Sequence, residues 1–202
     1  MGYLISALIG YALGCIQTAF ILSKTAGKMD IREHGSGNAG ASNITTIMGV
    51  KYGVIVGAVD VLKGLFAVLV LKWIYPANPD LAYLAGIFAI LGHIFPFYMK
   101  FRGGKGVATL VGMMFGLDWK LGVLFALLVI IPAAITDYIV VGSFTTFIAL
   151  PIVTYLLDYP LLFVFIGICL TVLIFYLHRF NIQRIRAGEE TRISSVLKKK
   201  EN

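Results

Sequence analysis

YGVIVGAVDVLKGLFAVLVLKWIY, residues 52–75, is the stretch of sequence that decides the fold class. It is longer than the roughly 20 apolar residues that a helix needs to cross a lipid bilayer. Charge within it is confined to Asp60, Lys63 and, near its end, Lys72. The stretch therefore predicts a transmembrane α-helix.

Further apolar runs lie on both sides of this one. The composition agrees with a membrane protein, because 59% of the residues are hydrophobic, 13% are charged and the mean hydropathy is +0.89. Such values exclude an ordinary water-soluble domain. The other runs lie near residues 2–22, 81–99, 106–118, 121–137, 139–157 and 161–178. The run at 106–118 is short and could be a partly inserted helix. We predict an all-α polytopic membrane protein with seven transmembrane helices, forming a single integral-membrane domain of residues 1–202.

The orientation of the chain follows from its lysines and arginines, because cytoplasmic loops retain them. Most of the 17 lie in the connection 23–51, in the segment 100–105 and in the tail after residue 178, all on one side of a seven-helix chain. The other side holds Lys72 and Lys120. The sequence therefore predicts an N-terminus outside and a C-terminus in the cytoplasm.

The net charge of +7 raises the alternative of a nucleic-acid partner. The basic residues sit in short loops beside apolar runs, however, and no extended basic domain is present to hold a duplex. We therefore predict no nucleic-acid partner, and contact with anionic lipid headgroups instead. Residues 179–202 predict a helix on the inner leaflet, since apolar residues stand there among cations. These apolar residues are Ile182, Ile185, Ile193, Val196 and Leu197.

Three polar segments interrupt the apolar background, at residues 34–46, 92–109 and 178–190, and all three open on the predicted cytoplasmic side. The first consists of small residues, hydroxyls and amides, which can fold tightly around a ligand and offer uncharged donors. The alternative is a plain loop, because the same residue types make ordinary turns. Its candidate ligand-binding residues are Ser36, Gly37, Asn38, Gly40, Ser42 and Asn43.

The second segment reads GHIFPFYMKFRGGKGVAT and suggests phosphate chemistry. Glycines allow backbone N–H groups to crowd an anion, and Lys105 adds a positive charge. It is not a P-loop, because that pattern needs a Gly where Met99 stands and a Ser or Thr where Gly106 stands. The alternative is a positive-inside anchor. His93 is either a structural residue or a phosphate-binding one. The candidate phosphate-binding residues are His93, Gly103, Gly104, Lys105 and Gly106.

The third segment, HRFNIQRIRAGEE, follows the last apolar run. His178, Asn181 and Arg184 are spaced three apart, so on a helix they share one face and could meet one anionic ligand. The alternative is a cluster of cations that stops membrane transfer. Inside the run 52–75, Asp60 and Lys63 stand at positions i and i+3, so they can form an ion pair. The alternative is that they help to shape a polar cavity.

Together the three segments resemble the bacterial acyl-phosphate:glycerol-3-phosphate acyltransferase family, PlsY. The resemblance covers the whole chain and is carried by motifs of the form SGNxGxTN, GHxxPxFxxFKGGKGVAT and HRxNIxRLxxGxE, in this order. The chain also departs from residues that are usual in this family. Ser42 stands where Thr is usual, Thr46 where Arg is common, Arg102 where Lys is usual and Glu189 where Thr is common.

The resemblance implies transfer of a fatty acyl group from acyl phosphate to the 1-hydroxyl of glycerol 3-phosphate. It implies a bacterial plasma membrane, a cytoplasmic active site and no cofactor. We expect His178 to assist proton removal, Lys105 to bind phosphate, Ser36 and Asn181 to donate hydrogen bonds, and Arg184 to assist. Ser143 is a further candidate for the pocket, no metal site is expected, and a monomer is compatible with the sequence. A transporter for a phosphorylated solute is the alternative from another class.

Overall fold

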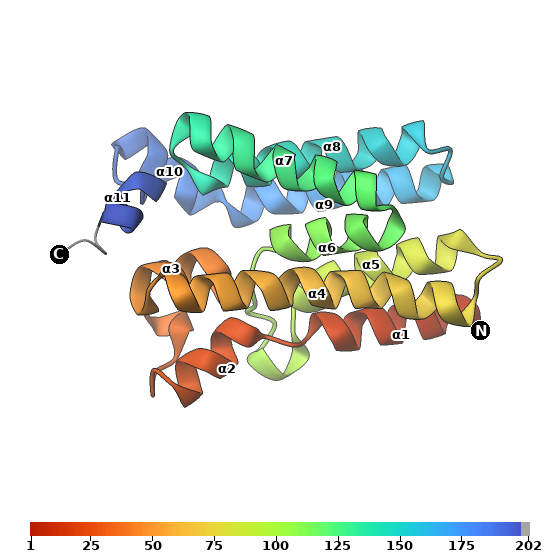
Figure 1. Cartoon of the computed structure of the whole chain (residues 1–202), viewed down its shortest axis with the longest axis horizontal. Coiled ribbons are helices and arrows are strands. Elements are labelled where there is room, and N and C mark those ends of the chain that lie inside the picture. The colour runs from red at the N-terminus through yellow and green to blue at the C-terminus, as the bar shows by residue number, and fades with distance from the viewer. Residues whose placement is uncertain (199–202) are drawn as a thin grey trace. The chain divides into compact units, whose positions relative to one another are not determined.

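The computed structural model describes residues 1–198, and the regular secondary structure of these residues is helical (Figure 1). The chain divides into two compact units, Met1–Val123 and Leu124–Asn202. In the first unit the helices are α1 (Gly2–Gly14), α2 (Thr18–Thr25), α3 (Ala41–Met48), α4 (Val50–Ile74), α5 (Pro79–Ile94) and α6 (Val107–Leu117), with 3-10 turns η1 (Ile31–Glu33) and η2 (Phe97–Met99).

The helix α7 (Trp119–Thr136) leads into the second unit. There α8 (Ile139–Leu156), α9 (Leu161–Leu177), α10 (Arg179–Ala187) and α11 (Ile193–Lys198) follow. Within this unit the Thr171 hydroxyl of α9 donates to the carbonyl of Phe147 on α8 at 2.6 Å. The hydroxyl thus links two apolar helices and gives a backbone carbonyl a hydrogen-bond donor, which lipid tails cannot supply.

The prediction of an all-helical polytopic membrane protein agrees with these helices. Among the described residues, five helical segments are long and apolar enough to cross a membrane, and six if α9 and α10, bent by 48°, form one span. The helix α6 is shorter, since its 11 residues extend for only about 16 Å. Seven crossings therefore depend on α6, and the count of seven stays a prediction.

The helices of the first unit pack closely where glycines face a neighbouring backbone. Gly10 and Gly14 of α1 lie against Ala85 and Ala89 of α5, and a Cβ at either glycine would overlap an alanine carbonyl oxygen. Small residues at four-residue spacing let two helices approach in lipid, where van der Waals contact replaces the hydrophobic effect as the driving force.

The short helix α6 runs along the second half of α4. Gly64 of α4 lies against the backbone of Thr109 near the start of α6, and Lys72 donates through Nζ to the carbonyl of Leu117 at its end, at 2.5 Å. The start of α6 therefore lies beside the middle of α4, where Lys63 stands.

The span predicted near residues 2–22 falls within the candidate membrane span Gly2–Thr25, but its helix is interrupted. The helix α1 ends at Gly14 and α2 begins at Thr18, and the interruption is visible in Figure 1. The buried Gln17 side chain fills the break, donating through Nε2 to the carbonyl of His93 at 2.9 Å. An apolar composition continues through the break, so hydropathy alone does not reveal it.

The tail also differs from the single helix predicted over residues 179–202. The helix α10 stops at Gly188, whose φ of +74° belongs to the left-handed region that favours glycine. The next helix, α11, is held at its start by Asp137, which accepts from the Ser194 N–H at 2.8 Å. The Leu197 side chain and residues 199–202 lie outside the described residues.

Candidate active site

The first polar segment folds around the side chain of Asn43. Its Oδ1 accepts a hydrogen bond from the Ser36 N–H at 2.9 Å, and its Nδ2 donates to the carbonyls of His34 and Asn38 at 2.9 and 3.0 Å. Gly35, with a φ of +59°, lies so close to Asn43 Oδ1 that a Cβ would overlap it. Asn43 is buried and Ser36 is exposed. Segment 34–46 is therefore a folded turn that displays Ser36 on its surface.

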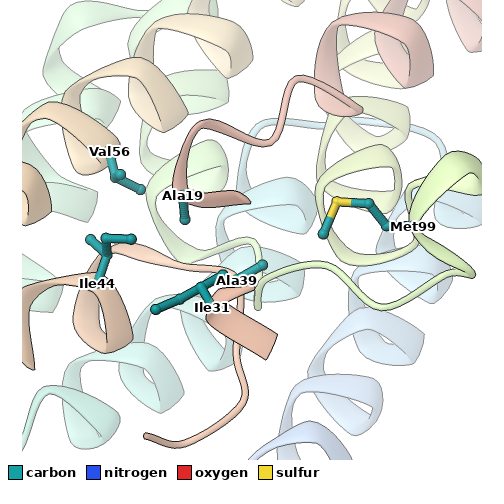
Figure 2. Packing of buried hydrophobic residues seen from close by; sticks show 6 residues of the cluster. All are labelled: Ala19, Ile31, Ala39, Ile44, Val56 and Met99. Carbon is teal, nitrogen blue, oxygen red and sulfur yellow. The ribbon is translucent and has the colours of Figure 1, made fainter. Parts of the chain in front are cut away.

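An apolar cluster ties this turn to the rest of the first unit (Figure 2). Its buried members come from α2, η1, the turn itself, α3, α4 and η2, so residues far apart in sequence share one core. They are Ala19, Ile31, Ala39, Ile44, Val56 and Met99. Burial of these side chains fixes the first polar segment against the second, which contains Met99.

Hydrogen bonds join the same two segments directly. The Ala39 N–H donates to the carbonyl of Gly103 at 3.4 Å, and Arg32 donates through Nη1 to the carbonyl of Met99 at 3.0 Å. Arg32 is itself held by Asp30, with Nη2 and Oδ2 2.7 Å apart. Hydrogen bonding to Arg32 lowers the pKa of the Asp30 carboxyl well below its usual range. The structure thus brings segments 34–46 and 92–109 together.

The glycines before Lys105 pack against the end of α5. The N–H groups of Gly103 and Gly104 donate to the carbonyls of Ile94 and His93 at 3.0 and 3.1 Å. A Cβ at Gly103 would overlap the His93 carbonyl, and one at Gly104 would overlap the His93 ring. Their N–H groups thus donate to the end of α5, and a phosphate-binding role for these glycines stays a prediction. They place the half-buried Lys105 directly after a tightly fixed backbone.

The charged residues of α4 form a buried ionic group with His93. Lys63 Nζ lies 2.8 Å from Asp60 Oδ1 and 2.7 Å from His93 Nδ1. All three side chains are buried. Of the two alternatives for Asp60 and Lys63, the ion pair is what the structure contains. His93 lies beside this ion pair, and its phosphate-binding role stays a prediction.

In the second unit, His178 is buried at the junction of α9 and α10. Its Nδ1 donates to the carbonyl of Ile174 at 2.9 Å, and its ring meets that of Phe144 edge-on with centroids 5.2 Å apart. Because a carbonyl only accepts, the proton of the neutral ring is on Nδ1 and the lone pair is on Nε2. Ser143, which precedes Phe144 on α8, donates to the carbonyl of Ile139 at 3.3 Å.

Asn181 and Arg184 share one face of α10, and that face holds the carboxylate of Glu190. Asn181 Nδ2 and Arg184 Nε donate to its two oxygens, each at 2.7 Å. We did not assign Glu190 a role from the sequence, because its return to α10 depends on the turn at Gly188. The pair predicted for one anionic ligand thus binds an anionic side chain of the chain itself.

Three more predicted residues lie at or just before the start of α3, and Gly106, with a φ of +79°, caps the start of α6. The backbone of Gly40 caps the start of α3, Gly37 has a φ of +72°, and Ser42 is exposed on the first turn of α3. Among residues 1–198, no group of three or more His, Cys, Asp or Glu side chains is arranged to hold a metal ion. The first two polar segments lie in the first unit and the third lies in the second.

Comparison with known proteins decides the family. Residues 4–188 match the family model described as glycerol-3-phosphate acyltransferase. The chain belongs to the glycerol-3-phosphate acyltransferase family. The resemblance that its three motifs suggested is thereby confirmed.

Members of the glycerol-3-phosphate acyltransferase family resemble the chain over nearly its full length. Glycerol-3-phosphate acyltransferase 1 of Oceanobacillus iheyensis is 38% identical over 99% of both chains. The enzyme of Thermoanaerobacter pseudethanolicus is 40% identical over 94% of both chains. The crystal structure of PlsY (YgiH), an integral membrane glycerol 3-phosphate acyltransferase, in its glycerol 3-phosphate form has a TM-score of 0.84, 33% identity and 96% coverage of each chain. Its lysophosphatidic acid form has a TM-score of 0.78 and 32% identity, with 95% of each chain covered.

Proposed function

We propose that this acyltransferase uses acyl phosphate as the donor and esterifies the 1-hydroxyl of glycerol 3-phosphate, releasing lysophosphatidic acid and inorganic phosphate. The observation that carries the proposal is the junction of the first two motif segments, where the Ala39 N–H donates to the Gly103 carbonyl, two residues before Lys105. Lys105 supplies a positive charge near the turn 34–46, which exposes Ser36, and this combination suits the binding of phosphate oxygens.

The reaction needs no covalent enzyme intermediate, because an acyl phosphate is an activated mixed anhydride. The hydroxyl oxygen of glycerol 3-phosphate attacks the carbonyl carbon, the bond from that carbon to the phosphate oxygen breaks, and phosphate leaves. The hydroxyl proton goes to a base. The protein must therefore hold two phosphate groups, align a hydroxyl with a carbonyl and stabilise the developing charge.

In this proposal His178 accepts the hydroxyl proton. Its Nδ1–H is directed to the Ile174 carbonyl, so Nε2 is the basic atom of the neutral ring. A phosphate oxygen of either substrate is the competing base. Lys105 binds phosphate, and Ser36 and Asn181 donate uncharged hydrogen bonds. Arg184, held by Glu190, adds positive charge beside Asn181.

We further propose seven crossings of a bacterial plasma membrane, with the N-terminus outside and the site facing the cytoplasm. Two contacts support this topology. Gly103 and Ala39 meet across α4 and α5, and Asp137 holds Ser194 across α8 and α9. Between the members of each pair lie two long apolar helices, as two crossings require, together with one short helix, α3 or α10. One copy of the chain carries all three motif segments, so the proposal needs no second copy.

The test is an assay of purified protein in detergent with synthetic acyl phosphate and glycerol 3-phosphate. Phosphate release that requires both substrates, with formation of lysophosphatidic acid, supports the proposal. Activity with acyl-CoA and none with acyl phosphate would overturn the donor assignment. Uptake of a phosphorylated solute into vesicles without any chemistry would favour the transporter alternative.

A further inference from the structure

The buried ionic group of Asp60, Lys63 and His93 lies where the first unit loses regular helix. The break between α1 and α2 falls at residues 15–17, and α5 ends at Ile94. The helix α4, which carries Asp60 and Lys63, is continuous from Val50 to Ile74. Interrupted helices leave backbone carbonyls without intrahelical donors, and at membrane depth other protein groups must satisfy them.

Lys63 supplies such a donor and makes three close polar contacts. Nζ donates to the carbonyl oxygen of Ile16, in the break, at 2.8 Å, pairs with the charge of Asp60 through Oδ1 at 2.8 Å, and lies 2.7 Å from His93 Nδ1. The Ile16 carbonyl can only accept, and the Asp60 carboxylate favours a charged lysine beside it. The lysine is therefore the ammonium, and it donates to His93 Nδ1.

This arrangement fixes the tautomer of His93. Its Nδ1 accepts from Lys63, so the neutral ring carries its proton on Nε2. The alternative, a protonated His93 donating to a neutral amine, fits less well because Asp60 Oδ1 is closer to Lys63 Nζ, at 2.8 Å, than to His93 Nδ1, at 3.5 Å.

His93 in turn contacts the glycine-lysine run through its carbonyl and its ring. Its carbonyl accepts from Gln17 Nε2 at 2.9 Å and from the Gly104 N–H at 3.1 Å. Its Nε2 edge lies so close to Gly104 that a Cβ there would overlap it. Lys105 is the next residue. A continuous chain of contacts therefore leads from the ammonium of α4 to the backbone that carries Lys105.

We propose that Asp60, Lys63 and His93 are positioning residues for acyl transfer. They join the α1–α2 break to the end of α5, hold Gly104 against the His93 ring and so fix the place of Lys105. The inference rests on the proposed function, in which Lys105 binds phosphate. An apolar trio could pack the same helices at less desolvation cost, but it could not satisfy the Ile16 carbonyl or hold the imidazole in one orientation.

The test replaces both charges at once, because removing one would leave the other buried and unpaired. In the Asp60→Asn/Lys63→Met variant we expect the KM for glycerol 3-phosphate to rise about tenfold or more per folded molecule, since Lys105 is displaced. Lys72→Met is the matched control on the same helix, with its KM within about twofold of wild type. If the double variant is folded and monodisperse and has the KM and kcat of the wild type, the proposal is overturned.

Two further measurements keep the proposal testable if the double variant does not fold. His93→Asn keeps an oxygen near the Nδ1 position for Lys63 but removes the ring edge beside Gly104. We expect the same rise in KM, and an unchanged KM would contradict the proposal. In the wild-type protein, ¹⁵N shifts of the histidine rings should show His93 protonated on Nε2. A proton on Nδ1 would overturn the assignment, and this result can be read even if acyl phosphate is not the donor.

Discussion

His93 and His178 hold their rings in opposite tautomers, and their neighbours are the reason. A lysine donates to Nδ1 of His93, whereas a carbonyl accepts from Nδ1 of His178. In the neutral rings, Nε2 is therefore a donor in His93 and an acceptor in His178. Only the second arrangement suits a general base, which agrees with the proton transfer proposed for His178.

His178→Ala tests that assignment. If His178 takes the hydroxyl proton, kcat at saturating substrate should fall by about 10²–10⁴. The measurement is initial-rate phosphate release over a range of glycerol 3-phosphate concentrations. A rise in KM with kcat retained would show that His178 binds substrate and that another group accepts the proton.

Lys105→Ala should be nearly inactive, with a loss in kcat/KM of about 10²–10³, because a cation aimed at phosphate oxygens would be missing. The same assay measures it. Lys120→Ala is the control, since Lys120 is an exposed lysine outside the three motif segments. A Lys105→Ala rate close to that of the control would remove Lys105 from the site.

At the scale of single elements, the turn 34–46 depends on one amide. Asn43→Asp keeps the shape of the side chain but replaces the donor to His34 and Asn38 with an oxygen that faces their carbonyls. A buried donor lost in this way costs about 1–3 kcal/mol or more. We expect a lower melting temperature together with loss of activity, measured by thermal unfolding in detergent and by the acyl-transfer assay. A fully active and stable variant would show that the turn does not need Asn43.

Asp30 gives a prediction about pH at the same scale. Its pKa is lowered, chiefly by hydrogen bonds from Arg32, so its stabilising contribution is present above the ordinary value of 3.8 and is lost as the pH falls below it. Between about pH 5 and pH 9 the carboxylate stays charged. Asp30→Asn should therefore lower activity by the same factor across this range. A ratio of variant to wild-type rates that changes with pH in this range would contradict the prediction.

Most helix bounds could be predicted from the sequence because apolar runs of bilayer length have few other structures available to them. The run predicted at 139–157 is the helix Ile139–Leu156, and the run at 106–118 is Val107–Leu117. The break at Gln17 could not be predicted, because its cause is the distant carbonyl of His93. Elements end where a partner outside the element satisfies the backbone, and local composition does not report that partner.

The candidate site also has features that local sequence predicts and others that only the fold determines. Its motif residues stand out against an apolar background, so the sequence reveals which residues are unusual. Their partners depend on the fold. The Glu190 carboxylate reaches Asn181 and Arg184 because the chain turns at Gly188. Lys63 on α4 reaches His93 on α5 because these two helices pack together.

At the scale of the whole molecule, the topology can be tested with single cysteines in a background where Cys15 and Cys169 are replaced by alanine. A membrane-impermeant maleimide added to spheroplasts should label Ala77→Cys and Lys120→Cys. Thr46→Cys and Ser195→Cys should react only after permeabilisation. All four positions are exposed in the structure. If Ser195→Cys is labelled from outside, the C-terminus is not in the cytoplasm and the proposed topology is wrong.

The short helix α6, which begins beside the middle of α4, has a consequence for how an amphiphilic donor is handled. The donor of the proposed function would hold its fatty chain in the membrane with its reactive head at the lipid–water boundary. Lifting it fully into water would expose the tail at about 0.8 kcal/mol per methylene. The residues before α6 lie beside the middle of α4, a helix long enough to cross a membrane. In the proposed function, this position lets Lys105 meet the donor's head without lifting the donor out of the membrane. The tail can then stay dissolved in the bilayer during turnover.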